Sequence, residues 1–313
     1  MTNVTSRFIG GIKPRPLIAY SKTINLNGFC GVRMECWYKK GGALLAEIAE
    51  TKSGGALLWF LGQMGFAVKM SGVIVYFDPF LNDFTDETGA PRCYGPPFTP
   101  EDGIEADYFV CTHDHADHLS LETLLPQARR NPRTRFIVPR PLTGILTGAG
   151  IDGSRVSGAR AGDVLELDGG LTLTPVAAAH DVYRTDENGD HLCLGYLLRD
   201  GETGVYHAGD TVVTPLLVET LRKLKPVNIA ILPVNGGDWE RSEAGITGNM
   251  TAEDAAKLAR AIDADLAVPA HYGLLSGNSA NPAFFAEAMY RLCPSKKYHI
   301  FAPGECFRYG LYG

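Results

Sequence analysis

The apolar positions in the first half of the chain fall in short runs separated by glycine, proline and aspartate. Runs of this length, bounded by turn residues, predict buried strands rather than helices. They occupy residues 56–62, 66–70, 72–80, 107–112, 134–139, 163–169 and 171–179. A further pair of runs predicts a hairpin over 195–210, with its turn at 201–203.

The second half alternates between helical spacing and strand-like runs. Helices are expected at 215–225, 251–262 and 282–292, and strands at 229–234, 266–271 and 298–303. Earlier in the chain, helical spacing occurs at 120–130 and 141–150, with Ser120 as an N-cap of the first and Thr251 and Asp254 as a capping box for 251–262. Two packed β-sheets with helices on their outer faces would accommodate this order.

The first 55 residues differ from the rest in pattern. They carry glycines, scattered basic residues and one short helical stretch around 43–50. We expect residues 1–55 to form an N-terminal extension that packs on a main domain of residues 56–313.

Composition narrows the class of protein. With 45% hydrophobic and 10% aromatic residues, the chain can bury a sizeable core. The net charge of −6 disfavours a general nucleic-acid binder, and no apolar run is long enough for a signal peptide or a membrane span. The seven cysteines include no CxxC pair, which argues against a thiolate zinc site and agrees with a cytoplasmic location.

The candidate chemistry is concentrated in the stretch THDHADHLS, residues 112–120. His113 and His115 are two residues apart in a loop that leaves a strand, and Asp117 and His118 follow where the chain enters a helix. Three more candidate ligands end apolar runs elsewhere, and they are His180, Asp210 and His271. Imidazole and carboxylate donors together suit zinc, manganese, iron or cobalt. Asp114 is expected to hold a neighbouring imidazole.

The motif HDHADH, with HAGDT and PAHYG further on, resembles the signature of the metallo-β-lactamase superfamily. The resemblance implies a four-layer αββα sandwich over residues 56–313. It also implies that His113, His115 and His180 hold one metal ion, that Asp117, His118 and His271 hold a second, and that Asp210 bridges both. The segments WFLGQMGFAVK, DPF, YRT and ITGNMTAEDAAKLARAI are similar to the L-ascorbate-6-phosphate lactonase-like branch.

These ligands predict a metal-dependent hydrolase. Two divalent ions, zinc or manganese with iron as an alternative, carry four positive charges, of which Asp117 and Asp210 offset two and a bridging hydroxide one. The remaining positive charge favours a small anionic substrate, such as a lactone or ester of the L-ascorbate-6-phosphate type. Asp117 is the candidate catalytic residue that accepts or relays a proton.

Two alternatives remain open. The same site could cleave a phosphodiester of a nucleotide, RNA or phospholipid, or the chain could be a non-catalytic metal or ligand sensor. A sensor would be expected to lack a ligand, and none is missing from the motifs.

Substrate contacts are less well defined by the sequence. Arg184 follows His180 closely and could bind a phosphate. The glycine-rich segment 235–250 predicts a loop over the site, with Asn235, Arg241 and Asn249 as candidate contacts, and His191 is a further candidate. Gln63, where the superfamily's first motif often has histidine, is given no catalytic role. The expected partners are the small anionic substrate and further copies of the chain as a homo-oligomer, with neither nucleic acid nor a membrane.

Overall fold

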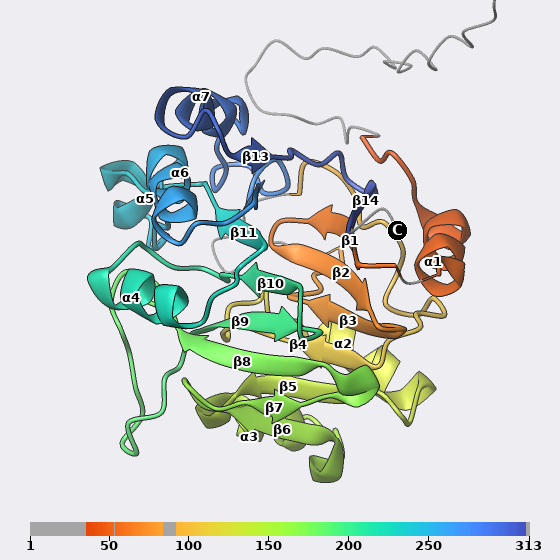
Figure 1. Cartoon of the computed structure of the whole chain (residues 1–313). Helices are drawn as coiled ribbons and strands as arrows, with labels where there is room; N and C mark the ends of the chain where they lie inside the picture. The colour runs from red at the N-terminus through yellow and green to blue at the C-terminus, as the bar shows by residue number, and fades with distance from the viewer. Residues whose placement is uncertain (1–35, 53, 84–91, 311–313) are drawn as a thin grey trace, which may run out of the picture. The chain divides into compact units, whose positions relative to one another are not determined.

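Two seven-stranded sheets form the centre of the computed structural model, which describes residues 36–52, 54–83 and 92–310 (Figure 1). The strand order of the first sheet is β14-β1-β2-β3-β4-β5-β6. Its strands are β1 (Ala56–Gly62), β2 (Gly65–Met70), β3 (Val73–Phe77), β4 (Tyr108–Val110), β5 (Arg135–Pro139), β6 (Val156–Ala159) and β14 (Cys306–Tyr309).

The second sheet has the order β13-β12-β11-β10-β9-β8-β7. Its strands are β7 (Leu165–Glu166), β8 (Thr172–Ala177), β9 (Leu194–Arg199), β10 (Gly204–His207), β11 (Ile229–Pro233), β12 (Leu266–Ala270) and β13 (Lys297–Tyr298). The predicted hairpin at 195–210 is confirmed, because β9 pairs with β10 in antiparallel register.

Helices cover the outer faces of both sheets (Figure 1). They are α1 (Gly41–Glu50), α2 (Leu121–Arg130), α3 (Thr143–Gly148), α4 (Pro215–Lys223), α5 (Trp239–Glu243), α6 (Ala252–Ala261) and α7 (Ala283–Leu292), with short 3-10 turns at Arg140–Leu142, Gly153–Arg155 and Asp168–Gly170. The predicted caps are confirmed: Ser120 accepts a hydrogen bond from the Thr123 amide, and Thr251 and Asp254 form a capping box.

Alternation along β1 explains how the layers form. Leu57 and Trp59 face a core that includes Leu44 of α1 and Leu124 of α2. The residues of β1 that alternate with them face the second sheet. That inter-sheet core includes Phe60, Phe66, Phe77, Leu173, Tyr196, Leu198 and Val205. The predicted αββα sandwich of the metallo-β-lactamase fold is therefore confirmed.

The predicted N-terminal extension is described only in part. Leu44 and Ile48 of α1 are buried in the core on the outer face of the first sheet, and the Lys69 ammonium donates to the carbonyl oxygens of Ile48 and Ala49 at the end of that helix. Residues 1–35 lie outside the described residues, so the extension as a whole stays a prediction. None of the helices in the described ranges combines the length and hydropathy needed to span a bilayer.

The strand predicted at 298–303 is wrong over most of its length. Lys297 and Tyr298 pair with β12, and the His299 amide adds a hydrogen bond to the Ala267 carbonyl at 3.1 Å before the chain crosses to the first sheet. There the Gly304 amide donates to the Phe60 carbonyl at 2.7 Å, and β14 pairs with β1. Within the apolar run, Tyr298 pairs with the second sheet, whereas the Phe301 ring packs against Phe60 and Phe66 of the first.

Candidate metal centre

The loop that follows β4 brings four of the predicted ligands to the end of the first sheet. His113 leaves the strand two residues after Cys111, and the amides of His118 and Leu119 both donate to the His115 carbonyl at 2.9 Å. This turn, which precedes α2, brings the histidines at the start of the HDHADH sequence and the Asp-His pair at its end to the same site. His113, Asp117 and His118 are buried, and His115 is half-buried.

Three strands of the second sheet deliver the remaining ligands to the same rim. His180 follows β8, Asp210 follows β10, and His271 follows β12 directly. All three side chains are buried. Since β8, β10 and β12 run in the same direction, their carboxyl ends lie at one edge of the sheet.

All seven predicted ligand side chains meet in overlapping groups. Within each group the donor atoms lie within 4.8 Å of one another. The groups are His113–His115–His180, His113–His118–Asp210 and Asp117–His118–His271. The rings of His113 and His118 are 4.0 Å apart between centroids, and those of His113 and His180 are 5.0 Å apart. Because the groups share members, the seven side chains form one continuous cluster of donor atoms.

Unpaired polar atoms in this cluster fit metal ions. Buried atoms there without a hydrogen-bond partner among the described residues include Nε2 of His113, Nε2 of His118 and Oδ1 of Asp210. Leaving a buried polar atom unpaired costs roughly 1–3 kcal/mol, so a cluster of them needs an occupant. Imidazole nitrogen and carboxylate oxygen are donors that zinc and manganese accept.

Neighbouring charges outweigh the effect of burial on the pKa values of His118 and Asp210. Burial lowers the pKa of His118, but the carboxylates of Asp117, Asp210 and Asp78 outweigh it and raise that pKa well above its ordinary value. Burial likewise raises the pKa of Asp210, and the imidazoles of His271 and His118 reverse this effect and hold it well below its usual range. The cluster therefore retains the ionised carboxylate of Asp210 in a buried position.

Two other histidines of the site, His113 and His180, are kept neutral by burial. Burial, reinforced by His118, lowers the pKa of His113 well below its ordinary value. Burial also lowers the pKa of His180 to about 4. Neutral imidazole is the form that binds a metal ion, so His113 and His180 are ready for a cation at neutral pH.

Asp78 is a residue of the site that the sequence analysis missed. Its Oδ2 lies 2.7 Å from Nδ1 of His118, and it accepts further hydrogen bonds from the amide and the hydroxyl of Thr112 at 2.8 and 2.7 Å. A carboxylate on one ring nitrogen directs the other towards a metal. Asp114, which was expected to do this, is exposed and makes no hydrogen bond to an imidazole among the described residues. The sequence signal that could have identified Asp78 is the Asp-Pro pair near the end of the run 72–80.

Two of the predicted substrate contacts lie on the segment after His180. Arg184 is exposed, and its guanidinium donates to both carboxylate oxygens of Asp181 at 3.2 and 3.1 Å. His191 packs edge-on against Tyr183, with ring centroids 5.6 Å apart, and burial lowers its pKa. Neither belongs to a group of donor atoms that could hold a cation.

The other three predicted contacts stabilise the segment 235–250. Asn249 donates to the side-chain oxygen of Asn235 at 3.1 Å, and Asn235 in turn donates to Asn278 at 2.9 Å. Arg241 binds Asp238 at 2.6 Å and the carbonyl oxygen of Asn235 at 2.9 Å. The predicted loop contains the helix α5, which Asp238 caps. Their role as substrate contacts stays a prediction.

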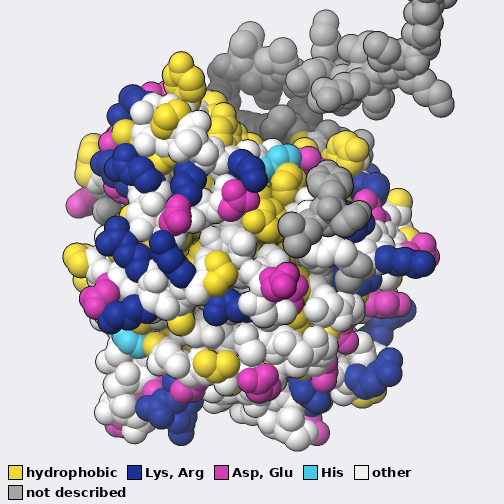
Figure 2. Space-filling view, in the orientation of Figure 1, with side chains coloured by type: hydrophobic (Ala, Val, Ile, Leu, Met, Phe, Trp, Pro, Cys, Tyr) yellow, Lys and Arg dark blue, Asp and Glu magenta, His cyan; other side chains and the backbone are white. Residues whose placement is uncertain are grey.

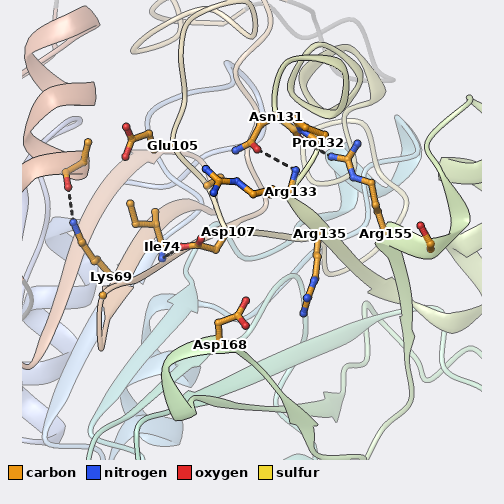
Figure 3. A pocket seen from close by; sticks show the side chains of 14 residues that line it. Lys69, Ile74, Glu105, Asp107, Asn131, Pro132, Arg133, Arg135, Arg155 and Asp168 are labelled. Atoms are coloured by element: carbon orange, nitrogen blue, oxygen red, sulfur yellow. Dashed lines mark hydrogen bonds between the residues drawn. The ribbon is translucent and has the colours of Figure 1, made fainter.

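A polar cavity of about 730 Å³ lies at the opposite ends of the strands (Figure 3). Lys69, Asp107, Arg133, Arg135 and Asp168 are among the side chains that surround it, near the points where β3, β4 and β5 begin. The candidate ligands follow the carboxyl ends of their strands, and none of them lines this cavity. It is therefore separate from the metal centre.

Comparison with known proteins gives one family model and several relatives. A model described as a β-lactamase superfamily domain matches residues 74–272. The chain is 27% identical over 252 residues to a UPF0173 metal-dependent hydrolase of Methanopyrus kandleri, covering 79% of this chain and 97% of that protein. It is 25% identical over 241 residues to N-acyl-phosphatidylethanolamine-hydrolyzing phospholipase D 1 of Caenorhabditis elegans, covering 74% of this chain and 67% of that protein.

Two solved structures share the fold at lower sequence identity. Igni18, a metallo hydrolase from the archaeon Ignicoccus hospitalis, superposes with a TM-score of 0.62 at 24% identity, covering 81% of this chain and 99% of its own. An isothiocyanate hydrolase from Delia radicum gut bacteria gives a TM-score of 0.64 at 19% identity, with the same coverage. At these identities the two structures support the fold alone.

Proposed function

The chain belongs to the metallo-β-lactamase superfamily and is a metal-dependent hydrolase, and from this premise we propose that its substrate is a small anionic lactone or ester. An L-ascorbate-6-phosphate-type lactone is the leading candidate within that class. The observation that carries the proposal is the complete set of seven converging donors, which includes unpaired buried atoms of His113, His118 and Asp210. A sensor that had lost catalysis would not be expected to retain the whole set.

We assign the donors to two cations. His113, His115 and His180 would hold one, Asp117, His118 and His271 the other, and Asp210 would be shared, since its Oδ2 lies 3.6 Å from Nε2 of His180 and 3.2 Å from Nε2 of His271. Zinc and manganese suit these donors, with iron as an alternative. When bound, such ions supply Lewis acidity, which makes water nucleophilic near neutral pH and offsets charge on a carbonyl oxygen.

The side chains themselves would orient the reaction. The Asp117 carboxylate lies with its Oδ2 3.5 Å from Nε2 of His118 and 3.8 Å from Nε2 of His271. It is positioned to accept a proton at the cation site or relay it to the leaving group. Asp117 and Asp210 return only two negative charges against the four positive charges of two divalent ions. The centre thus keeps an excess of positive charge that favours an anionic substrate.

A phosphodiester is the second candidate, and the resemblance to the C. elegans phospholipase D supports it. The same donor set would serve, because a phosphoryl oxygen is polarised by cations as a carbonyl oxygen is. A long polyanion is a poorer substrate for this chain. Figure 2 shows Lys and Arg side chains interspersed with Asp and Glu over the visible face rather than a continuous basic stripe, and the net charge is −6.

The test is metal analysis of gently purified protein followed by a panel of lactones, phosphorylated lactones, carboxylic esters and phosphodiesters. We expect hydrolysis of a member of the anionic lactone or ester group. His115→Ala should lower that activity by more than about 100-fold, because it removes a donor from the first group. Turnover confined to phosphodiesters would select the second candidate. Inactivity of metal-replete, folded protein on every member would overturn the hydrolase proposals for these substrates.

A further inference from the structure

The tip of the hairpin between β1 and β2 adopts an unusual backbone conformation beside the metal centre. Gln63 has a φ of 56°, in the left-handed region, and Gly62 before it has a φ of 96°. For glycine this region carries no steric penalty, but for glutamine it costs roughly 1 kcal/mol or more. A conformation of this kind persists only where surrounding contacts stabilise it.

Hydrogen bonds from the second sheet hold the hairpin tip in place. The His271 amide donates to the Gln63 carbonyl oxygen at 2.8 Å, and His271 itself has a left-handed φ of 62°. The next carbonyl, that of Met64, lies 2.7 Å from Nε2 of His207. The tip of the first sheet is thus bound to the strand end that presents a candidate metal ligand.

The Gln63 side chain enters the metal centre and is fully buried. Its amide nitrogen donates to Oδ2 of Asp117 at 2.9 Å and lies 3.1 Å from Nε2 of His271. The opposite amide orientation would place two oxygen acceptors against each other, so the N–H group faces Asp117. The amide oxygen has no hydrogen-bond partner among the described residues.

We propose that Gln63 is a positioning residue that orients the Asp117 carboxylate for the cation held by Asp117, His118 and His271. A carboxylate oxygen has lone pairs enough to accept one N–H and bind a cation at the same time. An amide donates this hydrogen bond without gaining or losing a proton near neutral pH, so proton transfer is left to Asp117. The metal-binding part of this inference rests on the geometry, and only its catalytic part rests on the proposed function.

Two substitutions remove the hydrogen bond in different ways. Gln63→Asn keeps an amide and tolerates the left-handed conformation, but it is one carbon too short to reach Asp117. Gln63→Met keeps the length and lacks the donor. Ser71→Met is the matched control, because Ser71 is an exposed residue with a φ of 48° in the next hairpin.

The measurement is the affinity of full-length protein for each Zn²⁺ ion, obtained by competition with a chromophoric chelator, with circular dichroism to confirm the fold. Both Gln63 variants should lower the affinity for one ion by about 10–100-fold and leave the affinity for the other unchanged. This range is typical of residues that orient a metal ligand. Ser71→Met should bind both ions as the wild type does. In an Asp117→Asn background, Gln63→Met should have no further effect, because Gln63 acts through Asp117.

Wild-type affinities in both folded Gln63 variants would overturn the proposal, and so would a loss that persists in full in the Asp117→Asn background. The hydrolase proposal fails separately. A wild-type protein that binds zinc but cleaves nothing on the substrate panel refutes the proposed reaction, while the affinities of the Gln63 variants still decide the role of this residue.

Discussion

The pKa of His118 is set by a competition between burial, which lowers it, and three carboxylates, which raise it well above its ordinary value. The metal-free chain therefore holds a proton on this imidazole at neutral pH. Its Nδ1 is bound to Asp78, so the unpaired Nε2 is the atom left for a cation. Binding of a metal ion there must displace a proton.

We accordingly expect zinc binding to release protons and the affinity to rise with pH, as His118 loses its proton more readily. Titration calorimetry at pH 7 in buffers of different ionisation enthalpy measures this release directly. His118→Ala, which removes the titrating ring, should release fewer protons at the remaining site. Identical heats in all buffers for the wild type would show that His118 is already neutral or does not bind the ion.

At the level of elements, the ends of β4 and β10 approach so closely that glycine is required between them. Gly209 lies directly before Asp210 and has a φ of 60°. A Cβ at this position would lie 2.7 Å from Cβ of Thr112, the residue that binds Asp78. The contact joins the two sheets at the metal centre, and its packing determines where Asp210 is placed.

Gly209→Ala should therefore destabilise the fold by about 2–4 kcal/mol, from left-handed backbone strain together with overpacking against Thr112. The control is Gly201→Ala in the turn between β9 and β10. Gly201 has a φ of 96° and nothing within 4 Å of the added carbon, so only the backbone strain remains, roughly 1 kcal/mol. Urea unfolding measures both. Equal losses in the two variants would mean that the close approach of the strands is not sterically limiting.

The elements and ligands that the sequence predicts well are those with local signals. The helix at 251–262 has its capping residues within one turn, and His180, Asp210 and His271 each end an apolar run that forms a strand. Asp78 could not be assigned in this way, because its partner His118 lies 40 residues further along the chain. The same is true of Gln63, whose contact with Asp117 depends on the packing of a hairpin against a distant loop.

At the scale of the whole described domain, the candidate ligands are divided between the two sheets. The first sheet contributes the loop that contains His113 and His118, and the second contributes His180, Asp210 and His271. Cations at the centre would therefore link the two halves of the sandwich at one rim. Because the donors come together only in the folded chain, the free energy of binding adds to the free energy of unfolding.

Removal of the metal should consequently lower the thermal stability of the protein. A single ion at a free concentration 100 times its Kd stabilises the folded state by about 2.7 kcal/mol. For a chain of this size, each kcal/mol of stability shifts Tm by about 2–4 °C. Chelation should thus lower Tm by about 5–10 °C for each ion lost, as measured by scanning calorimetry, and added zinc or manganese should restore it. In Asp210→Ala, which lacks the carboxylate that we assign to both cations, the chelator should change Tm much less. A Tm that is the same with and without chelator in metal-loaded wild type would contradict the link between the sheets.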